Sequence, residues 1–416
     1  MKYKNLVSLP FILILLLAFT CCKNDNKISS KSTKNDDSGL KITSSPATGI
    51  TSEPYLFSSD NSVFLSWVEK TNDSLYTLLY SQSRDSVWSN PDTIASGTDW
   101  FNNWADYPIL VANKEVFIAH FLQKSASGKY TYDIKYKVKA ADSTWGQSIL
   151  LNEDHVQAEH GFVSLMPYGE NFIASWLDGR NTVNENKALN QMTVRAAIIN
   201  PEGNKLEEYL IDDRVCDCCQ TSIAVPDDGP VIVYRDRSED EKEVRDISIV
   251  RLQDTIWSTP KVISKDNWQL NGCPVNGPRA SAYKNTVAVA WFSAANDKPK
   301  VQIVFSGNGG ESFDPAIRLD SGKPIGRIDV EMLDENTAVV SWLETVASKD
   351  VIVAMKVNKE GVRSQPIQIA TSSAERSSGF PQMALLNDHL YFAWTTNLEN
   401  KSSVITAIFP VSDFTE

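Results

Sequence analysis

The sequence predicts an all-β fold in which one four-stranded unit is repeated around an axis. Short apolar strands that end in a large ring-bearing side chain recur at intervals of 51 to 58 residues, and each lies between other short strands. Almost no segment has the periodicity of an amphipathic helix. Together these observations indicate a β-propeller. The recurring strands end at Trp67, His120, Trp176, Tyr234, Trp291, Trp342 and Trp394.

The repeat predicts seven blades, with six as the alternative if one unit is irregular. The segment "LKITS" at residues 40–44 is a spare strand before the first unit, and the seventh unit ends at "VITAIFP" with no fourth strand after it. Pairing these two segments would close the ring and cover two exposed strand edges. We therefore expect the propeller domain to span residues 40–416, with its N-terminal strand closing the ring.

The first 39 residues are expected to lie outside this domain. Residues 1–20 combine two early lysines with the apolar run 6–19, which is typical of an export signal. "LAFTC" resembles the lipobox of bacterial lipoproteins, which implies a lipid on Cys21, with Cys22 or a plain cleaved signal as alternatives. Residues 21–39 are almost wholly polar and predict a solvated tether. The expected location is the cell envelope, in the periplasm or at the outer-membrane surface, with the membrane reached through the lipid anchor.

Charge and motif content exclude several classes of function. The net charge of −12 and the pI near 5.0 argue against a nucleic acid or an anionic membrane surface as partner. The sequence has no Gly-rich phosphate loop, no Ser nucleophile elbow and no His-Glu-x-x-His pair. We expect a monomer without a bound cofactor, apart from the metal alternative given below.

Two segments resemble the sialidase superfamily. "SGNGGESF", Ser306 to Phe313, resembles the Asp-box, a turn motif that stabilises the fold and carries no chemistry. "EHGFVSLMPYGENFIASWLDGRN", residues 159–181, is similar to the sialidase segment that holds a glutamate and one arginine of a carboxylate clamp. The Arg-Ile-Pro motif of that family is absent from the first blade.

This resemblance implies roles for particular residues if the protein is an enzyme. Glu159 would assist a tyrosine nucleophile, for which Tyr234 is the nearest candidate, and Asp178 would be the acid-base group. The clamp would comprise Arg180, with Arg279 and Arg327 assigned by position. The implied activity is glycoside hydrolysis of exo-sialidase type, although the missing motif predicts little release of sialic acid.

Propeller topology places further polar residues near one end of the axis. Loops that enter innermost strands and loops that leave second strands emerge on the same face, where ligands usually bind. These loops include Arg235 and Arg237 of "VYRDRS", while Trp100 and Trp104 lie outside the repeat and are candidates for stacking on a ligand. The sequence thus predicts an arginine-bearing funnel for a polar or anionic ligand, with a glycan as the first candidate.

Four cysteines lie in loops on the same face: Cys216, Cys218, Cys219 and Cys273. Export favours oxidation, and Cys273 enters the blade that follows the one entered by the other three, so we expect a disulfide from Cys273 to one of them. The alternative is a metal-binding or redox protein, in which these thiolates and His160 hold copper or zinc.

Overall fold

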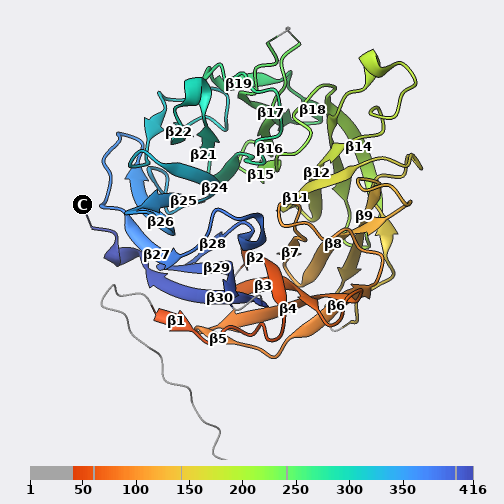
Figure 1. Ribbon diagram of the computed structural model, residues 1–416, viewed down its shortest axis with the longest axis horizontal. Helices are drawn as coiled ribbons and strands as arrows, with labels where there is room; N and C mark the ends of the chain where they lie inside the picture. The colour runs from red at the N-terminus through yellow and green to blue at the C-terminus, as the bar shows by residue number, and fades with distance from the viewer. Residues whose placement is uncertain (1–40, 60, 142, 240–241, 399–400, 416) are drawn as a thin grey trace, which may run out of the picture. The chain divides into compact units, whose positions relative to one another are not determined.

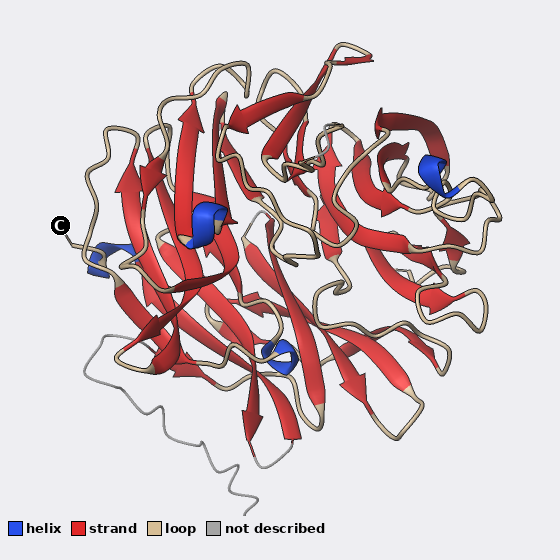
Figure 2. Cartoon of the chain, turned by 45° about the horizontal axis from the view of Figure 1, so that its top comes forward, coloured by secondary structure: helices blue, strands red, loops and turns tan. Residues whose placement is uncertain are grey.

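The prediction of an all-β, seven-bladed propeller is confirmed. The computed structural model describes residues 41–59, 61–141, 143–239, 242–398 and 401–415. Seven antiparallel sheets surround a central axis in the propeller unit (Figure 1), and strands make up nearly all of its regular structure (Figure 2). The expected signal, the lipidated Cys21 and the tether lie outside the described residues. Within the described ranges, no helix has the length and hydrophobicity needed to span a bilayer.

The first four blades each run outward from an innermost strand beside the axis. Blade 1 contains β2 (Thr51–Ser59), β3 (Ser62–Lys70), β4 (Tyr76–Arg84), β5 (Val87–Trp88) and β6 (Asp92–Gly97). Blade 2 contains β7 (Leu110–Asn113), β8 (Val116–Lys124), β9 (Tyr132–Lys139) and β10 (Ile149–Leu150). Blade 3 contains β11 (His160–Tyr168), β12 (Asn171–Asp178), β13 (Thr193–Ile199) and β14 (Lys205–Asp212). Blade 4 contains β15 (Ser222–Ala224), β16 (Val231–Arg235), β17 (Ile247–Gln253), β18 (Ile256–Trp257) and β19 (Lys261–Ser264).

The remaining three blades follow the same order, and the last one recruits the first strand of the chain. Blade 5 contains β20 (Arg279–Tyr283), β21 (Thr286–Ser293), β22 (Lys300–Ser306) and β23 (Ile317–Arg318). Blade 6 contains β24 (Pro324–Met332), β25 (Thr337–Val346), β26 (Lys349–Asn358) and β27 (Ile367–Thr371). Blade 7 contains β28 (Gln382–Leu386), β29 (His389–Leu398), β30 (Lys401–Pro410) and β1 (Lys41–Thr43). The described 3₁₀ turns are η1 (Lys187–Leu189), η2 (Ala295–Asp297), η3 (Arg376–Ser378) and η4 (Val411–Asp413).

The ring closes as expected, by pairing of β1 with β30. The two strands are antiparallel, with Lys41 opposite Ile408 and Thr43 opposite Thr406. A second contact joins the first and last blades, because the Val404 N–H donates to the Thr51 hydroxyl at 2.9 Å. The outer edge of the last blade is therefore paired rather than open to solvent.

The recurring strand-end residues lie in the core, as the repeat predicts. Trp67, Trp176, Trp291 and Trp342 are at most 1% exposed. Two of these indoles are satisfied by a carboxylate two residues further on, since Trp176 Nε1 donates to Asp178 and Trp342 Nε1 donates to Glu344, both at 2.8 Å. A buried indole needs such an acceptor for its N–H. The acidic residues after these strands therefore serve the core.

The Asp-box-like segment forms a turn between β22 and β23 that is closed by its own side chains. The Ser306 hydroxyl accepts from the Gly310 N–H at 2.9 Å, and Asn308 Oδ1 accepts from the Ser312 N–H at 3.0 Å. Gly310 has φ +83°, and a Cβ there would lie 2.8 Å from Ile249 of the preceding blade. The segment thus closes its own turn and packs against the preceding blade.

Candidate functional site

A cavity of about 520 Å³ lies on the face where the loops enter the innermost strands. Its walls come from the loop before β7, the β8–β9 loop, the start of β11, the loops that lead into β15 and β20, and η3. These are the loops expected to form the funnel. We call this cavity the funnel pocket, and the residues that define it below are Phe101, Trp104, Tyr130, Glu159, Asp217 and the Cys218–Cys273 disulfide.

Aromatic side chains form one side of the funnel pocket. Phe101 contacts Tyr130 edge to face, with ring centroids 6.2 Å apart, and Tyr130 is 51% exposed. Trp104 is half-buried and stacks on Phe380, with centroids 5.6 Å apart. Trp104 therefore occupies the kind of position expected for a ligand-stacking residue. Trp100 does not, because it is buried and stacks on Phe121 at 4.7 Å in the core.

Glu159 supplies a carboxyl group to the pocket wall and is the expected catalytic residue that lies there. Burial raises its pKa to about 7, although the hydrogen bond that Tyr132 Oη donates to Glu159 Oε1 at 2.9 Å acts in the opposite direction. The second pocket carboxyl, Asp217, also has a raised pKa because of burial. A carboxyl group with a pKa near 7 can donate or accept a proton at neutral pH.

A second buried acid stands behind Glu159. Asp106 accepts the Phe162 N–H at 2.6 Å and lies 3.4 Å from Tyr132 Oη, and burial raises its pKa to about 8. Gly161 is needed for this packing, because a Cβ there would lie 2.0 Å from Asp106 Oδ2. Sequence reasoning missed the role of Tyr132, since nothing in its strand pattern marks it as a partner for an acid in the next blade.

The other two residues expected to be catalytic lie away from the pocket wall. Tyr234 is fully buried, and its hydroxyl donates to Asp212 at 2.7 Å. Asp178 is also fully buried, where it accepts from Trp176 and pairs with Arg180. The structure therefore does not bring Glu159, Tyr234 and Asp178 together as a catalytic set.

The expected arginine clamp is not assembled, because each arginine is engaged by its own partners. Arg180 pairs with Asp178 at 2.7 Å and Asp154 at 3.0 Å. Arg279 pairs with Asp329 at 3.1 Å, and these two residues line a separate cavity of about 210 Å³ on the propeller axis. In the part of the chain that the structure describes, neither Arg180 nor Arg279 lines the funnel pocket.

Arg327 is buried, and its guanidinium holds the loop before β28. It donates to the carbonyls of Gly379 at 2.9 Å and Ala374 at 2.8 Å, and it lies 4.9 Å from the Trp104 ring centroid. Burial lowers the pKa of Arg327 to about 10. Arg327 thus packs against Trp104 and does not line the funnel pocket.

Arg235 and Arg237 also have roles other than the expected ligand contact. Arg235 is 2% exposed and donates to the carbonyls of Asn276, Arg245 and Phe292 at 2.6 to 3.1 Å. Arg237 pairs with Glu243 at 2.6 Å and lies 3.7 Å from Asp217. The described cations that do line the pocket are Lys129 and Arg376, both exposed, and sequence reasoning did not select them.

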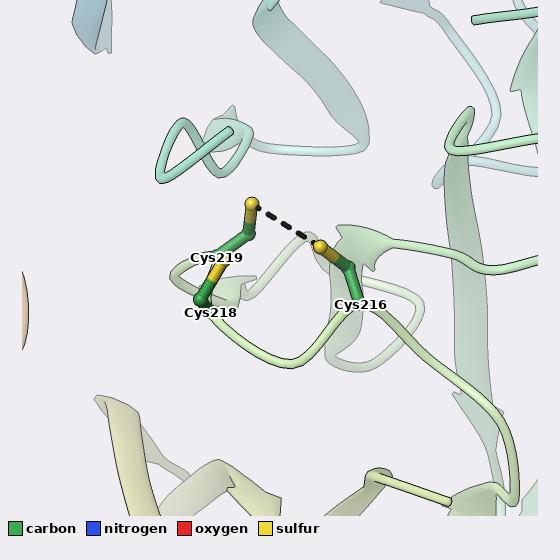
Figure 3. Close-up of side chains that lie close together, drawn as sticks. All are labelled: Cys216, Cys218 and Cys219. Atoms are coloured by element: carbon green, nitrogen blue, oxygen red, sulfur yellow. Dashed lines mark hydrogen bonds between the residues drawn. The ribbon is translucent and has the colours of Figure 1, made fainter. Parts of the chain in front are cut away.

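The cysteine loops meet as expected, since Cys218 and Cys273 form a disulfide with Cα atoms 6.0 Å apart. Cys216 and Cys219 are free thiols, both 1% exposed, with Sγ atoms 3.7 Å apart (Figure 3). Their spacing is Cys-x-x-Cys, a signal that was present in the sequence and was overlooked.

The hydrogen bond with Cys219 lowers the pKa of Cys216 to about 6, helped by the charges of Arg245 and Arg235.

Neither cluster of possible metal ligands fits an ion well as it stands. The Sγ atoms of Cys216, Cys218 and Cys219 lie within 4.8 Å of one another, but Cys218 is already bonded to Cys273. Asp154, His160 and Asp178 form the second group. There the Arg180 guanidinium already neutralises both carboxylates, and His160 Nε2 lies 3.0 Å from Asp154. His160 is thus not placed with the cysteines.

Comparison with known proteins confirms the fold. No protein-family model and no curated protein sequence matches the chain. Polysaccharide lyase Uly1 is similar in structure, with a TM-score of 0.53 and 9% identity over 92% of this chain and 94% of the lyase. Similar structures also include a Penicillium chrysogenum α-L-arabinanase (TM-score 0.47, 10% identity, 88% and 94% covered) and the Hadza microbial sialidase Hz136 (TM-score 0.43, 12% identity, 70% and 63% covered). In fold, the chain is a seven-bladed β-propeller, and its similarity to the lyase shows this fold alone.

Proposed function

We propose that this protein is a lipid-anchored protein of the cell envelope that binds a glycan in the funnel pocket. The single observation that carries the proposal is the composition of the pocket wall. The aromatic residues Phe101, Trp104 and Tyr130 line the same cavity as the acidic residues Glu159 and Asp217. Sugars present apolar ring faces and many hydroxyl groups, and a wall that combines aromatic rings with a few polar groups matches both.

The charged groups of the pocket favour a glycan that carries an acidic group. Lys129 and Arg376 are exposed at the pocket. They supply the positive charge that the sequence analysis expected from other arginines. Glu159 is partly protonated at neutral pH because burial raises its pKa to about 7, so its repulsion of an anion is weakened. The structural likeness to a polysaccharide lyase supports a glycan ligand.

Glycoside hydrolysis is the second candidate function, favoured by the presence of two carboxyl groups in one pocket. Glu159 and Asp217 both have raised pKa values, and hydrolysis needs one acid and one carboxylate. A tyrosine nucleophile activated by Glu159 is not supported, because Tyr132, which contacts Glu159, is fully buried and Phe101 stacks on its ring at 3.9 Å. We therefore place binding first.

The proposal is tested with the purified full-length protein on an array of neutral and acidic glycans, followed by calorimetry on the best ligand. We expect Tyr130→Ala and Trp104→Ala to weaken binding about tenfold or more, which is about 1.4 kcal/mol each. Tyr283→Ala is the matched control, because Tyr283 is an exposed aromatic residue at the end of β20 in blade 5, outside the pocket. A glycan affinity that survives both pocket substitutions would contradict the proposal, as would the absence of any glycan ligand.

Hydrolysis is tested on the same ligands by following the release of reducing ends. Glu159→Gln should abolish turnover while leaving binding within a few-fold of the wild type, because the amide keeps the shape and loses the proton. Binding without turnover by the wild type would exclude the second candidate and leave the first intact.

A further inference from the structure

We propose that Cys216 and Cys219 exchange with the Cys218–Cys273 disulfide, so that the four cysteines form a thiol–disulfide exchange unit in the wall of the funnel pocket. This activity is independent of the proposed glycan binding. It rests on the positions of the sulfur atoms and on the groups that surround them.

The geometry places a free thiol beside a disulfide sulfur. The Sγ atoms of Cys216, Cys218 and Cys219 all lie within 4.8 Å of one another, and one short turn carries all three residues (Figure 3). Thiol–disulfide exchange requires a thiolate close to the sulfur that it attacks. Cys218 is that sulfur, because it belongs to both the cluster and the disulfide.

The surroundings of Cys216 favour its thiolate form. The Cys218 N–H and the charges of Arg245 and Arg235 act in the same direction as the contact with Cys219, and the pKa of Cys216 falls to about 6. The Arg235 charge is fixed in place, because its guanidinium donates to three backbone carbonyls. A thiolate stabilised by fixed charges and N–H donors is the usual form of a reactive cysteine.

The first step transfers the disulfide within the cluster. The Cys216 thiolate forms a bond to Cys218 Sγ while the bond between Cys218 and Cys273 breaks. The bonding electron pair leaves with Cys273, which takes up a proton from solvent and becomes an exposed thiol. This step conserves the number of disulfides, so no external oxidant or reductant is needed.

The second step moves the disulfide to the buried pair. Cys219 attacks Cys216 Sγ at the contact that now measures 3.7 Å, and the proton of Cys219 passes to the sulfur that leaves. Cys218 leaves as a thiolate and takes up one proton. The products are a Cys216–Cys219 disulfide and two thiols, Cys218 and Cys273, that line the funnel pocket.

The exchange changes the reactivity of the pocket. In this structure both free thiols are 1% exposed, whereas Cys273 lies in an exposed loop. The exchanged form therefore presents a reactive thiol at the surface, while the original form hides its thiols. A maleimide reagent distinguishes the two forms, because it alkylates exposed thiols and traps them.

The test treats the folded full-length protein, with Cys21 and Cys22 replaced by serine, with N-ethylmaleimide, without oxygen, after two free thiols per chain have been counted. Unreduced peptides are then mapped by mass spectrometry. We expect label on Cys273 and Cys218 together with a Cys216–Cys219 disulfide. Label confined to Cys216 and Cys219, with the Cys218–Cys273 bond intact, would overturn the proposal.

Two matched variants separate the steps. Cys219→Ser should stop after the first step and yield labelled Cys273 with a Cys216–Cys218 disulfide. Cys216→Ser removes the attacking thiolate and should label Cys273 at least about tenfold more slowly. Both variants remove one buried thiol, so equal labelling of Cys273 in the two would count against the proposed sequence of attack.

Discussion

The hydroxyl of Tyr132 donates a hydrogen bond of 2.9 Å to Glu159 Oε1 and thereby joins blade 2 to the wall of the funnel pocket. The two residues are 27 positions apart, and the isolated β-bridge between them fixes their backbones side by side. The hydrogen bond lowers the pKa of Glu159, while burial raises it more strongly. A partner in a neighbouring blade thus limits how far burial raises the pKa of Glu159.

Tyr132→Phe should raise the pKa of Glu159 above its present value of about 7, by roughly one pH unit. The phenyl ring keeps the stack on Phe101, so the change removes only the donor. The pKa of Glu159 is measured from the pH dependence of its carboxyl carbon NMR signal. That signal is assigned by its loss in Glu159→Gln. Tyr136→Phe is the control, since Tyr136 lies on the same strand as Tyr132 but its Oη donates to the Gly203 carbonyl in the β13–β14 turn of blade 3. An equal shift of the Glu159 pKa in both variants would contradict the role of the Tyr132 hydrogen bond.

As pH rises, Asp106→Asn should lose less stability than the wild type does. Burial raises the folded-state pKa of Asp106 to about 8, so the folded protein holds a proton that the unfolded chain releases near pH 4. The stabilisation from this group is therefore complete below about pH 4 and is lost as pH rises toward 8. Asparagine keeps the Oδ1 acceptor for the Phe162 N–H without titrating.

Urea unfolding at pH 5 and pH 8 checks this sign. The wild type should lose at least about 1 kcal/mol more between the two pH values than Asp106→Asn does. Glu331, whose pKa burial also raises to about 8, contributes to both proteins and cancels in the difference. An identical loss in the two proteins would show that Asp106 is ionised in the fold.

Arg235→Met should destabilise the protein by on the order of 3 kcal/mol or more, because it leaves buried carbonyls of Asn276, Arg245 and Phe292 without their donor. Arg237→Ala, two residues away, should cost at most about 1 kcal/mol, since Arg237 makes a partly exposed ion pair. Thermal unfolding compares the two variants. Similar, small losses would restore Arg235 as a ligand-binding candidate.

Gly161→Ala should destabilise the fold by about 2 kcal/mol, since the new Cβ would overlap Asp106 Oδ2 and press on the Tyr132 ring. Gly307→Ala is the control, because a Cβ at Gly307 meets nothing within 4 Å. Denaturant midpoints for both variants give the comparison. A stable Gly161→Ala protein would mean that Asp106 can move away from Phe162.

The fold could be predicted from the sequence because its signals are local and repeated. Each blade contains its own alternating strands and an aromatic residue at the end of the second strand, so seven copies reinforce one interpretation. The disulfide followed from the same logic, since loops into adjacent blades must meet. Only the particular partner, Cys218, required coordinates.

The site was harder to predict because its chemistry depends on partners far away in the sequence. The segment "VYRDRS" suggests that Arg235 is a free cation, yet its acceptors lie 10, 41 and 57 residues further on. Tyr132 has no sequence feature that marks it as the partner of Glu159. Nothing in a strand pattern distinguishes an arginine that faces a cavity from one that fills the space between blades.

The pairing of β1 with β30 also has a consequence for the order of events in folding. The partner of the first described strand is the last one, so the seam is formed by segments from opposite ends of the propeller. Blades 1 to 6 contain only neighbouring segments and can form while later parts are still missing. The ring itself closes only after Lys401–Pro410 is in place, across the largest sequence separation in the sheet network. Until β1 pairs with β30, the outer edge of β30 and the segment Lys41–Thr43 are unpaired edges that a second chain could join.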